Sequence, residues 1–136
     1  MGHYAKLDEN NIVLEVNVVD DEQEETLGGE SATVEWLKTH WGGADWKKCS
    51  YNTIRNQHRY GGTPFRGNYP GQGYIYSPEL DAFYSPPWHE CMVFDESVMD
   101  WEEPTPPPDD ENEYYFDGDR WDPDTPHSGW FRVREE

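Results

Sequence analysis

The fold is decided near the N-terminus, by the stretch YAKLDENNIVLEVNVV at residues 4–19. Its apolar residues flank residues 8–11, where Asp, Glu and two Asn residues form a cluster typical of tight turns. This pattern predicts a β-hairpin with strands at 4–7 and 12–19. Alternation along the second strand places one apolar face on Ile12, Leu14, Val16 and Val18.

The chain after this hairpin predicts one short helix and a returning strand. Residues 20–30 are acidic and are expected to form a loop. Ser31 is a suitable N-cap for a helix over 32–41, and Gly42 and Gly43 are suitable for ending it. Val34, Leu37 and Trp41 fall on one face of this helix. A third strand is expected at 46–51, so the N-terminal half is the predicted folding core.

Residues 52–73 show no periodicity and are rich in glycine and arginine. An irregular loop of this length in a compact domain is usually functional or disordered. We favour a functional loop over a mobile connection, because its basic content suits an acidic patch, including one on a neighbouring copy of the chain.

The C-terminal half contains a repeated pattern of two aromatics around a polar turn. It occurs at 76–83 (YSPELDAF), at 94–101 (FDESVMDW) and, in a looser form, at 121–130. Each copy predicts a tight hairpin whose flanking rings meet across the strands. Three such hairpins do not make a large core, so their outer faces need something to pack against.

Proline and acidic residues dominate residues 102–113, which favours an extended polyproline spacer. The predicted organisation is therefore a β-rich domain with one helix at 1–101, this spacer, and a C-terminal hairpin or arm at 114–136. The fold class is α+β and mostly β, with an N-terminal hairpin, one short helix, tandem short aromatic hairpins and extended arms.

Composition restricts the function. The 136 residues carry a formal charge of −19, and Leu, Ile, Val and Phe together number only 21. Seven Trp and nine Tyr indicate several small aromatic clusters rather than disorder. The negative charge disfavours nucleic acid as a partner and favours a basic protein surface. No apolar run suits a membrane span or an export signal, and two distant cysteines suggest reduced thiols.

No motif indicates catalysis, a cofactor or a metal. His89, Cys91 and Cys49 lack the spacing of a structural zinc site. Residues 117–124 offer four carboxylates, which leaves calcium binding open beside the simpler interpretation of a solvated acidic turn. No nucleophile, base and orienting group can be identified together, so we predict that the chain is not an enzyme.

Aromatic and arginine side chains are the usual energetic anchors of protein interfaces. Candidate interface residues lie in the irregular loop and on the hairpins: Arg55, Arg59, Arg66, Tyr69, Tyr74, Trp88, Trp121, Trp130 and Phe131.

Two motifs resemble those of a known family. The stretch RGNYPGQGYIYSPELDAFYSPPW at residues 66–88 and the opening at residues 2–13 are similar to small proteins of tailed phages that infect marine cyanobacteria. The aromatic, acidic hairpins of residues 91–133 resemble repeats of the same proteins. The resemblance implies a virion or phage accessory protein, located in the virion and made in the host cytoplasm, and it transfers no catalytic residue.

These observations favour a non-enzymatic virion protein, present in many copies, that binds the major capsid protein or other virion proteins as a capsid decoration or cement protein. A tail, neck or fibre attachment protein is an alternative. An acidic inhibitor that mimics DNA and blocks a host protein is an alternative of another class, and binding of glycans by exposed Trp rings is a third.

Overall fold

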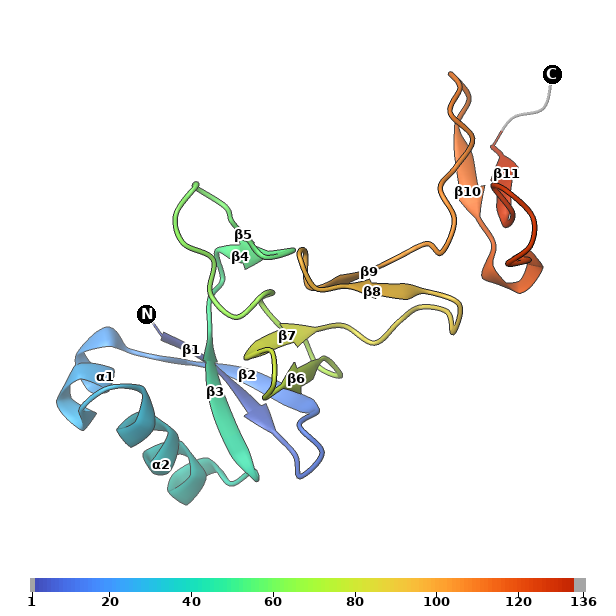
Figure 1. Cartoon of the computed structure of the whole chain (residues 1–136). Coiled ribbons are helices and arrows are strands. Elements are labelled where there is room, and N and C mark those ends of the chain that lie inside the picture. The colour runs from blue at the N-terminus through green and yellow to red at the C-terminus, as the bar shows by residue number, and fades with distance from the viewer. Residues whose placement is uncertain (1, 134–136) are drawn as a thin grey trace. The chain divides into compact units, whose positions relative to one another are not determined.

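The computed structural model describes residues 2–133 and confirms the predicted α+β, mostly β class (Figure 1). The chain divides into two compact units. Unit 1 comprises residues 2–86 and 96–100, and unit 2 comprises 87–95 and 101–133. The domain boundary predicted from the sequence lies after Trp101. The last three residues of the predicted arm, 134–136, lie outside the described residues.

The predicted N-terminal hairpin is confirmed. Strands β1 (Gly2–Leu7) and β2 (Val13–Val19) pair antiparallel, and β3 (Asp45–Cys49) pairs with the other edge of β1, which gives the order β2-β1-β3. The turn is stabilised by Asp8, whose Oδ1 accepts hydrogen bonds from the backbone N–H groups of Asn10 (2.8 Å) and Ile12 (3.0 Å). Such side-chain bonds are the reason that Asp favours turns.

A β-bulge makes the predicted apolar face of β2 wrong. Lys6 pairs with Glu15 and Leu7 pairs with Val13, so Leu14 has no partner across β1. The extra residue shifts the alternation, as bulges do. Val13 is therefore buried, whereas Leu14 and Val18 are 42% and 52% exposed.

The acidic segment predicted as a loop is mostly helical. Helix α1 (Asp21–Leu27) consists mostly of good helix formers and carries acidic residues in its first turn, where they interact favourably with the helix dipole. It ends at Gly28, whose φ of 109° places it in the left-handed region. Helix α2 (Glu30–Trp41) follows directly and begins before Ser31, so Ser31 is not its cap.

Unit 1 buries residues on both faces of its sheet. The helices cover one face and the hairpin of β6 (Ile75–Ser77) and β7 (Ala82–Tyr84) covers the other (Figure 1). The helix-side cluster contains Tyr4, Val19, Leu37 and Trp46, with Val34 and Trp36 against it. The hairpin-side cluster contains Ala5, Leu7, Val13, Cys49, Tyr76 and Phe83. Trp41, predicted to share one face of this helix with Val34 and Leu37, is 57% exposed.

The first two aromatic hairpins are confirmed. Tyr76 pairs with Phe83, and their ring centroids lie 5.2 Å apart. Strands β8 (Val93–Asp95) and β9 (Asp100–Glu102) form the second hairpin, with the rings of Phe94 and Trp101 also 5.2 Å apart. The sixth residue of each repeat, Asp81 or Met99, has a positive φ.

The third hairpin forms with other residues than predicted. Strand β10 (Tyr114–Phe116) pairs with β11 (Trp130–Arg132), so Phe116 rather than Trp121 lies opposite Trp130. Asp117 accepts a hydrogen bond from the backbone N–H of Asp119 and caps a 3₁₀ helix at Gly118–Arg120. This turn removes Trp121 from the strand.

A short hairpin of β4 (Thr53–Ile54) and β5 (Gln57–His58) completes the strands. Within residues 2–133 no helix is both long and apolar enough to cross a membrane.

Candidate functional site

Residues 52–73, predicted as an irregular loop, contain the short hairpin of β4 and β5. Arg55 and Asn56 connect β4 to β5 with φ values of 50° and 58°, as a two-residue type I′ turn requires. Thr53 is completely buried beneath it. Its hydroxyl accepts a hydrogen bond from the backbone N–H of Phe65 (3.0 Å), and its carbonyl accepts one from Tyr69 (2.8 Å). These bonds fix the segment against unit 1.

Three rings from distant parts of the sequence meet beside this hairpin. His3 of β1 stacks on Tyr51 at a centroid distance of 6.0 Å and meets the edge of Tyr69 at 5.4 Å. Tyr51 and Tyr69 are themselves 5.4 Å apart. A hydrogen bond of 3.2 Å joins the Tyr69 hydroxyl to Nδ1 of His3. Tyr51 remains 52% exposed, so the group presents an aromatic face to solvent.

Arg59 adds a positive charge to this face. Its guanidinium lies 4.8 Å from the centre of the Tyr51 ring, a distance typical of cation–π contact. Interaction with the hydroxyls of Tyr60 and Tyr51 raises the pKa of Arg59. We call His3, Tyr51, Arg59, Tyr60 and Tyr69 the aromatic–basic surface.

Two open grooves border the aromatic–basic surface, with volumes of about 470 and 290 Å³. Both are lined by Tyr51 and Asn52, the larger one also by Lys48 and Phe65, and the smaller one also by His58. Among residues 2–133, no Asp or Glu lines either groove. Burial lowers the pKa of His3 and thereby disfavours its charged form. The fixed positive charge of the surface therefore comes from Arg59.

Three predicted interface residues line a separate groove of unit 1. Arg55, Tyr69 and Tyr74 surround a volume of about 240 Å³ together with Asp100. Arg55 forms an ion pair with Asp100 across this groove. Tyr74 also packs against the hairpin-side core.

Arg66, another predicted interface residue, is held inside unit 1. Its side chain is only 11% exposed and forms ion pairs with Glu30 and Asp81. Its guanidinium also donates a hydrogen bond to the carbonyl of Lys48 (2.9 Å). This side chain connects α2, β3 and the β6–β7 turn, a structural role that the sequence did not reveal.

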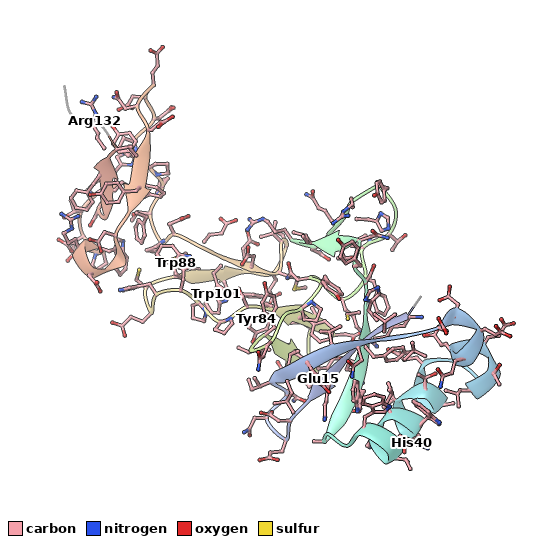
Figure 2. The ribbon with its side chains drawn as sticks, turned by 180° about the vertical axis from the view of Figure 1, so that it is seen from behind. Glu15, His40, Tyr84, Trp88, Trp101 and Arg132 are labelled. Carbon is pink, nitrogen blue, oxygen red and sulfur yellow. The ribbon has the colours of Figure 1, made fainter. Side chains whose placement is uncertain are left out.

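Two predicted interface residues of unit 2 share one aromatic group. Trp88 is 58% exposed and meets the edge of Phe116 at 5.8 Å. Trp130 contacts the same ring at 5.2 Å, and its indole N–H donates to the carbonyl of Thr105 (2.8 Å). Trp88 lies on the segment before β8, and Figure 2 labels it together with Trp101 on β9.

The other two predicted interface residues of unit 2, Phe131 and Trp121, lie in a different environment. Phe131 is covered by the guanidinium of Arg120, 3.7 Å from the ring centre, and lies 5.9 Å from Tyr115. Trp121 is half-buried, and its indole nitrogen has no hydrogen-bond partner among residues 2–133.

The residues considered for metal binding have other contacts. Both oxygens of Asp117 accept hydrogen bonds, from Asp119 and Arg120, and both oxygens of Asp122 do so from Asp124 and Thr125. Across the described part of the chain, His, Cys, Asp and Glu side chains form no group of three suited to an ion. Both cysteines are free thiols, and burial raises the pKa of Cys49 to about 12.

Sequence reasoning missed His3, Tyr51 and Tyr60. A signal for this region does exist: residues 46–78 contain no Asp or Glu, although the whole chain has 29. The same window contains Lys47, Lys48, Arg55, Arg59 and Arg66. An acid-free window in so acidic a chain marks a surface of different electrostatic character. Comparison with family models, with curated proteins and with solved structures gives no match.

Proposed function

We propose that this chain is a non-enzymatic structural protein of a tailed-phage virion that binds an assembled protein shell as a capsid decoration or cement protein. Its partners are the major capsid protein or other virion proteins. The likeness of residues 2–13 and 66–88 to small cyanophage proteins supports the class of particle. The architecture of unit 2 supports the mode of action.

The observation that carries the proposal is the thin core of unit 2. Met92 is the one apolar side chain of its described residues that is buried. The rings of Trp88 and Tyr115 are 58% and 48% exposed. Small hairpins need a surface to pack against for full stability, and exposed aromatic patches mark interaction sites. A shell protein beneath unit 2 would supply that surface.

Charge also supports a protein partner over a nucleic acid. At −19 the chain repels phosphate backbones and attracts basic protein surfaces.

The first test is quantitative mass spectrometry of purified, nuclease-treated particles, which gives the copies of this chain per copy of the major capsid protein. Shell decoration predicts a ratio near one or a simple fraction of one, because each shell site is repeated by symmetry. A count of about 6 to 30 per particle would instead indicate a neck, tail or fibre position. Complete absence from particles would refute the virion proposal and favour the DNA-mimicking inhibitor.

A deletion tests the role of the C-terminal arm. Removal of residues 111–136 takes away β10 and β11 and leaves unit 1 unchanged in sequence. We expect the shortened chain to keep the near-ultraviolet circular dichroism of the Trp46 core and to lose incorporation into particles. Unchanged incorporation would contradict a role for the arm.

A further inference from the structure

The aromatic–basic surface has the features of a peptide-binding surface. Tyr51 is half-exposed, Tyr60 is 77% exposed, and Tyr51 lines both grooves. Rings held by contact with other rings lose little further freedom when a ligand packs on them. Arg59 stacks on Tyr51 and forms no ion pair with any described residue. Its charge is therefore available to an anionic partner.

The same chain carries a segment of complementary chemistry. Residues 102–113 contain four prolines and six carboxylates. Its outer part, residues 106–113, forms neither helix nor strand, and Pro106, Pro107 and residues 109–113 are exposed. The side chains of Asp109, Glu111 and Glu113 form no ion pair within residues 2–133. This part of the segment can be followed between β9 and β10 in Figure 1.

We propose that the aromatic–basic surface binds the acidic, proline-rich segment 106–113 of a second copy of this chain. The contact would place proline rings against Tyr51 and Tyr60 and carboxylates beside Arg59. The inference deepens the proposed function, on which it rests for its biological setting.

Physical chemistry favours this pairing on two grounds. Consecutive prolines hold a polyproline II helix before binding, and aromatic-lined grooves bind such helices at a low entropic cost. The absence of acidic residues over 46–78 makes this surface the region of the chain where a carboxylate meets the least repulsion. Because the rest of the chain is strongly acidic and repels carboxylates, charge also directs the segment to this surface.

The two partners of the contact are different surfaces, so two copies can exchange segments reciprocally or the interface can be heterologous. A heterologous contact extends from copy to copy and closes into rings or continues along a lattice. A contact made by one short segment is weak in solution, but copies that already sit side by side on a shell raise its effective concentration. The contact would thus link neighbouring copies rather than make a stable free dimer.

The experiment uses a fluorescent synthetic peptide of residues 102–113 titrated with the full chain, with anisotropy as the readout. We expect saturable binding. Arg59→Gln should weaken it about tenfold, and Tyr51→Ser should weaken it by a similar factor. Lys38→Gln is the matched control, because it removes one positive charge from the half-exposed side chain of α2 that pairs with Glu35, and it should change the affinity less than about twofold. Near-ultraviolet circular dichroism confirms that each variant remains folded.

A second peptide separates shape from charge. Replacement of Pro106, Pro107 and Pro108 by alanine keeps all six carboxylates and should weaken binding about fivefold or more, because the preformed extended helix is lost. Equal binding of both peptides, or equal binding to Arg59→Gln and Lys38→Gln, would overturn the proposal.

Sedimentation equilibrium of the full chain tests the second copy. The mean mass should rise with concentration, and excess peptide or Arg59→Gln should suppress the rise. A chain that stays monomeric up to about 1 mM overturns the proposal. This outcome together with normal incorporation into particles would leave the proposed function intact, whereas self-association together with absence from particles would refute only the proposed function.

Discussion

The two units differ in what lies beneath their aromatic hairpins. In unit 1 the rings of Tyr76 and Phe83 lie 5.2 Å apart, and Phe83 is completely buried against the β-sheet. In unit 2 the rings of Phe116 and Trp130 also lie 5.2 Å apart, yet both remain partly exposed. Cross-strand ring pairs with the same centroid distance therefore occur both with and without a covering layer. The stability of each hairpin should depend on that layer more than on the ring pair.

The largest expected difference between the units is in thiol reactivity, because each unit contains one free cysteine. Cys49 is buried in the core of unit 1 with its pKa raised to about 12, whereas Cys91 of unit 2 is half-buried. We expect iodoacetamide at pH 8 to alkylate Cys91 about a hundredfold faster than Cys49, since Cys49 needs opening of the core. Peptide mapping over a time course measures both rates, and similar rates would contradict the comparison.

Removal of one ring from each hairpin should affect stability very differently. Phe83→Ala creates a cavity beneath a covered hairpin and should lower the free energy of unfolding by about 3–5 kcal/mol. Phe116→Ala removes a partly exposed ring and should cost about 1 kcal/mol, confined to unit 2. Urea unfolding followed by tryptophan fluorescence gives the first value, and hydrogen exchange over β10 and β11 gives the second. Equal losses of unfolding free energy in the two variants would show that the layer covering the unit 1 hairpin is unimportant.

A carboxylate connects the helix layer of unit 1 to its sheet. Glu24 of α1 accepts hydrogen bonds from the Tyr4 hydroxyl (2.6 Å) and the Lys48 ammonium (2.8 Å). Burial opposes ionisation, but these two bonds outweigh it and lower the pKa of Glu24. The carboxylate therefore stabilises unit 1 at pH values above its unfolded pKa, and this stabilisation is lost as the pH falls through the lowered folded pKa.

Glu24→Gln should therefore reduce the free energy of unfolding by about 2 kcal/mol at pH 7, since bonds to a charged group are lost or weakened. The difference from the unaltered protein should shrink as the pH falls from the unfolded pKa of about 4.3 and disappear below the lowered folded pKa. Urea unfolding at a series of pH values measures it. Glu25→Gln, on the exposed side of the same helix, is the matched control and should have little effect. A difference that persists at pH 2 would contradict the electrostatic origin.

The smallest expected effect lies at the bulge. Leu14 is apolar but 42% exposed in an otherwise well-packed unit. Its substitution therefore tests whether burial or residue type determines the loss of unfolding free energy. Leu14→Ser should change the free energy of unfolding by less than about 0.5 kcal/mol. Val13→Ala, at the buried neighbouring position, should cost about 2 kcal/mol. Urea unfolding of both variants provides the test, and the opposite order would mean that the bulge lies elsewhere in solution.

Much of the local structure was predictable. The first hairpin and the aromatic hairpins at 76–83 and 94–101 depend on turn residues and alternation within a few positions, and they form where the sequence places them. The third hairpin was misplaced, because the capped 3₁₀ turn after Phe116 competes with extension of the strand to Trp121.

The sequence by itself therefore determined the fold class, two of the three aromatic hairpins and the formal charge of −19. Only the tertiary structure decided which faces are buried, that Arg66 lies inside unit 1, and that His3, Tyr51 and Tyr69 meet on one surface. Turn chemistry and alternation act between near neighbours, so a local pattern contains them. Burial and the meeting of β1 with residues about forty or more positions away depend on the packing of whole layers, which no local pattern specifies.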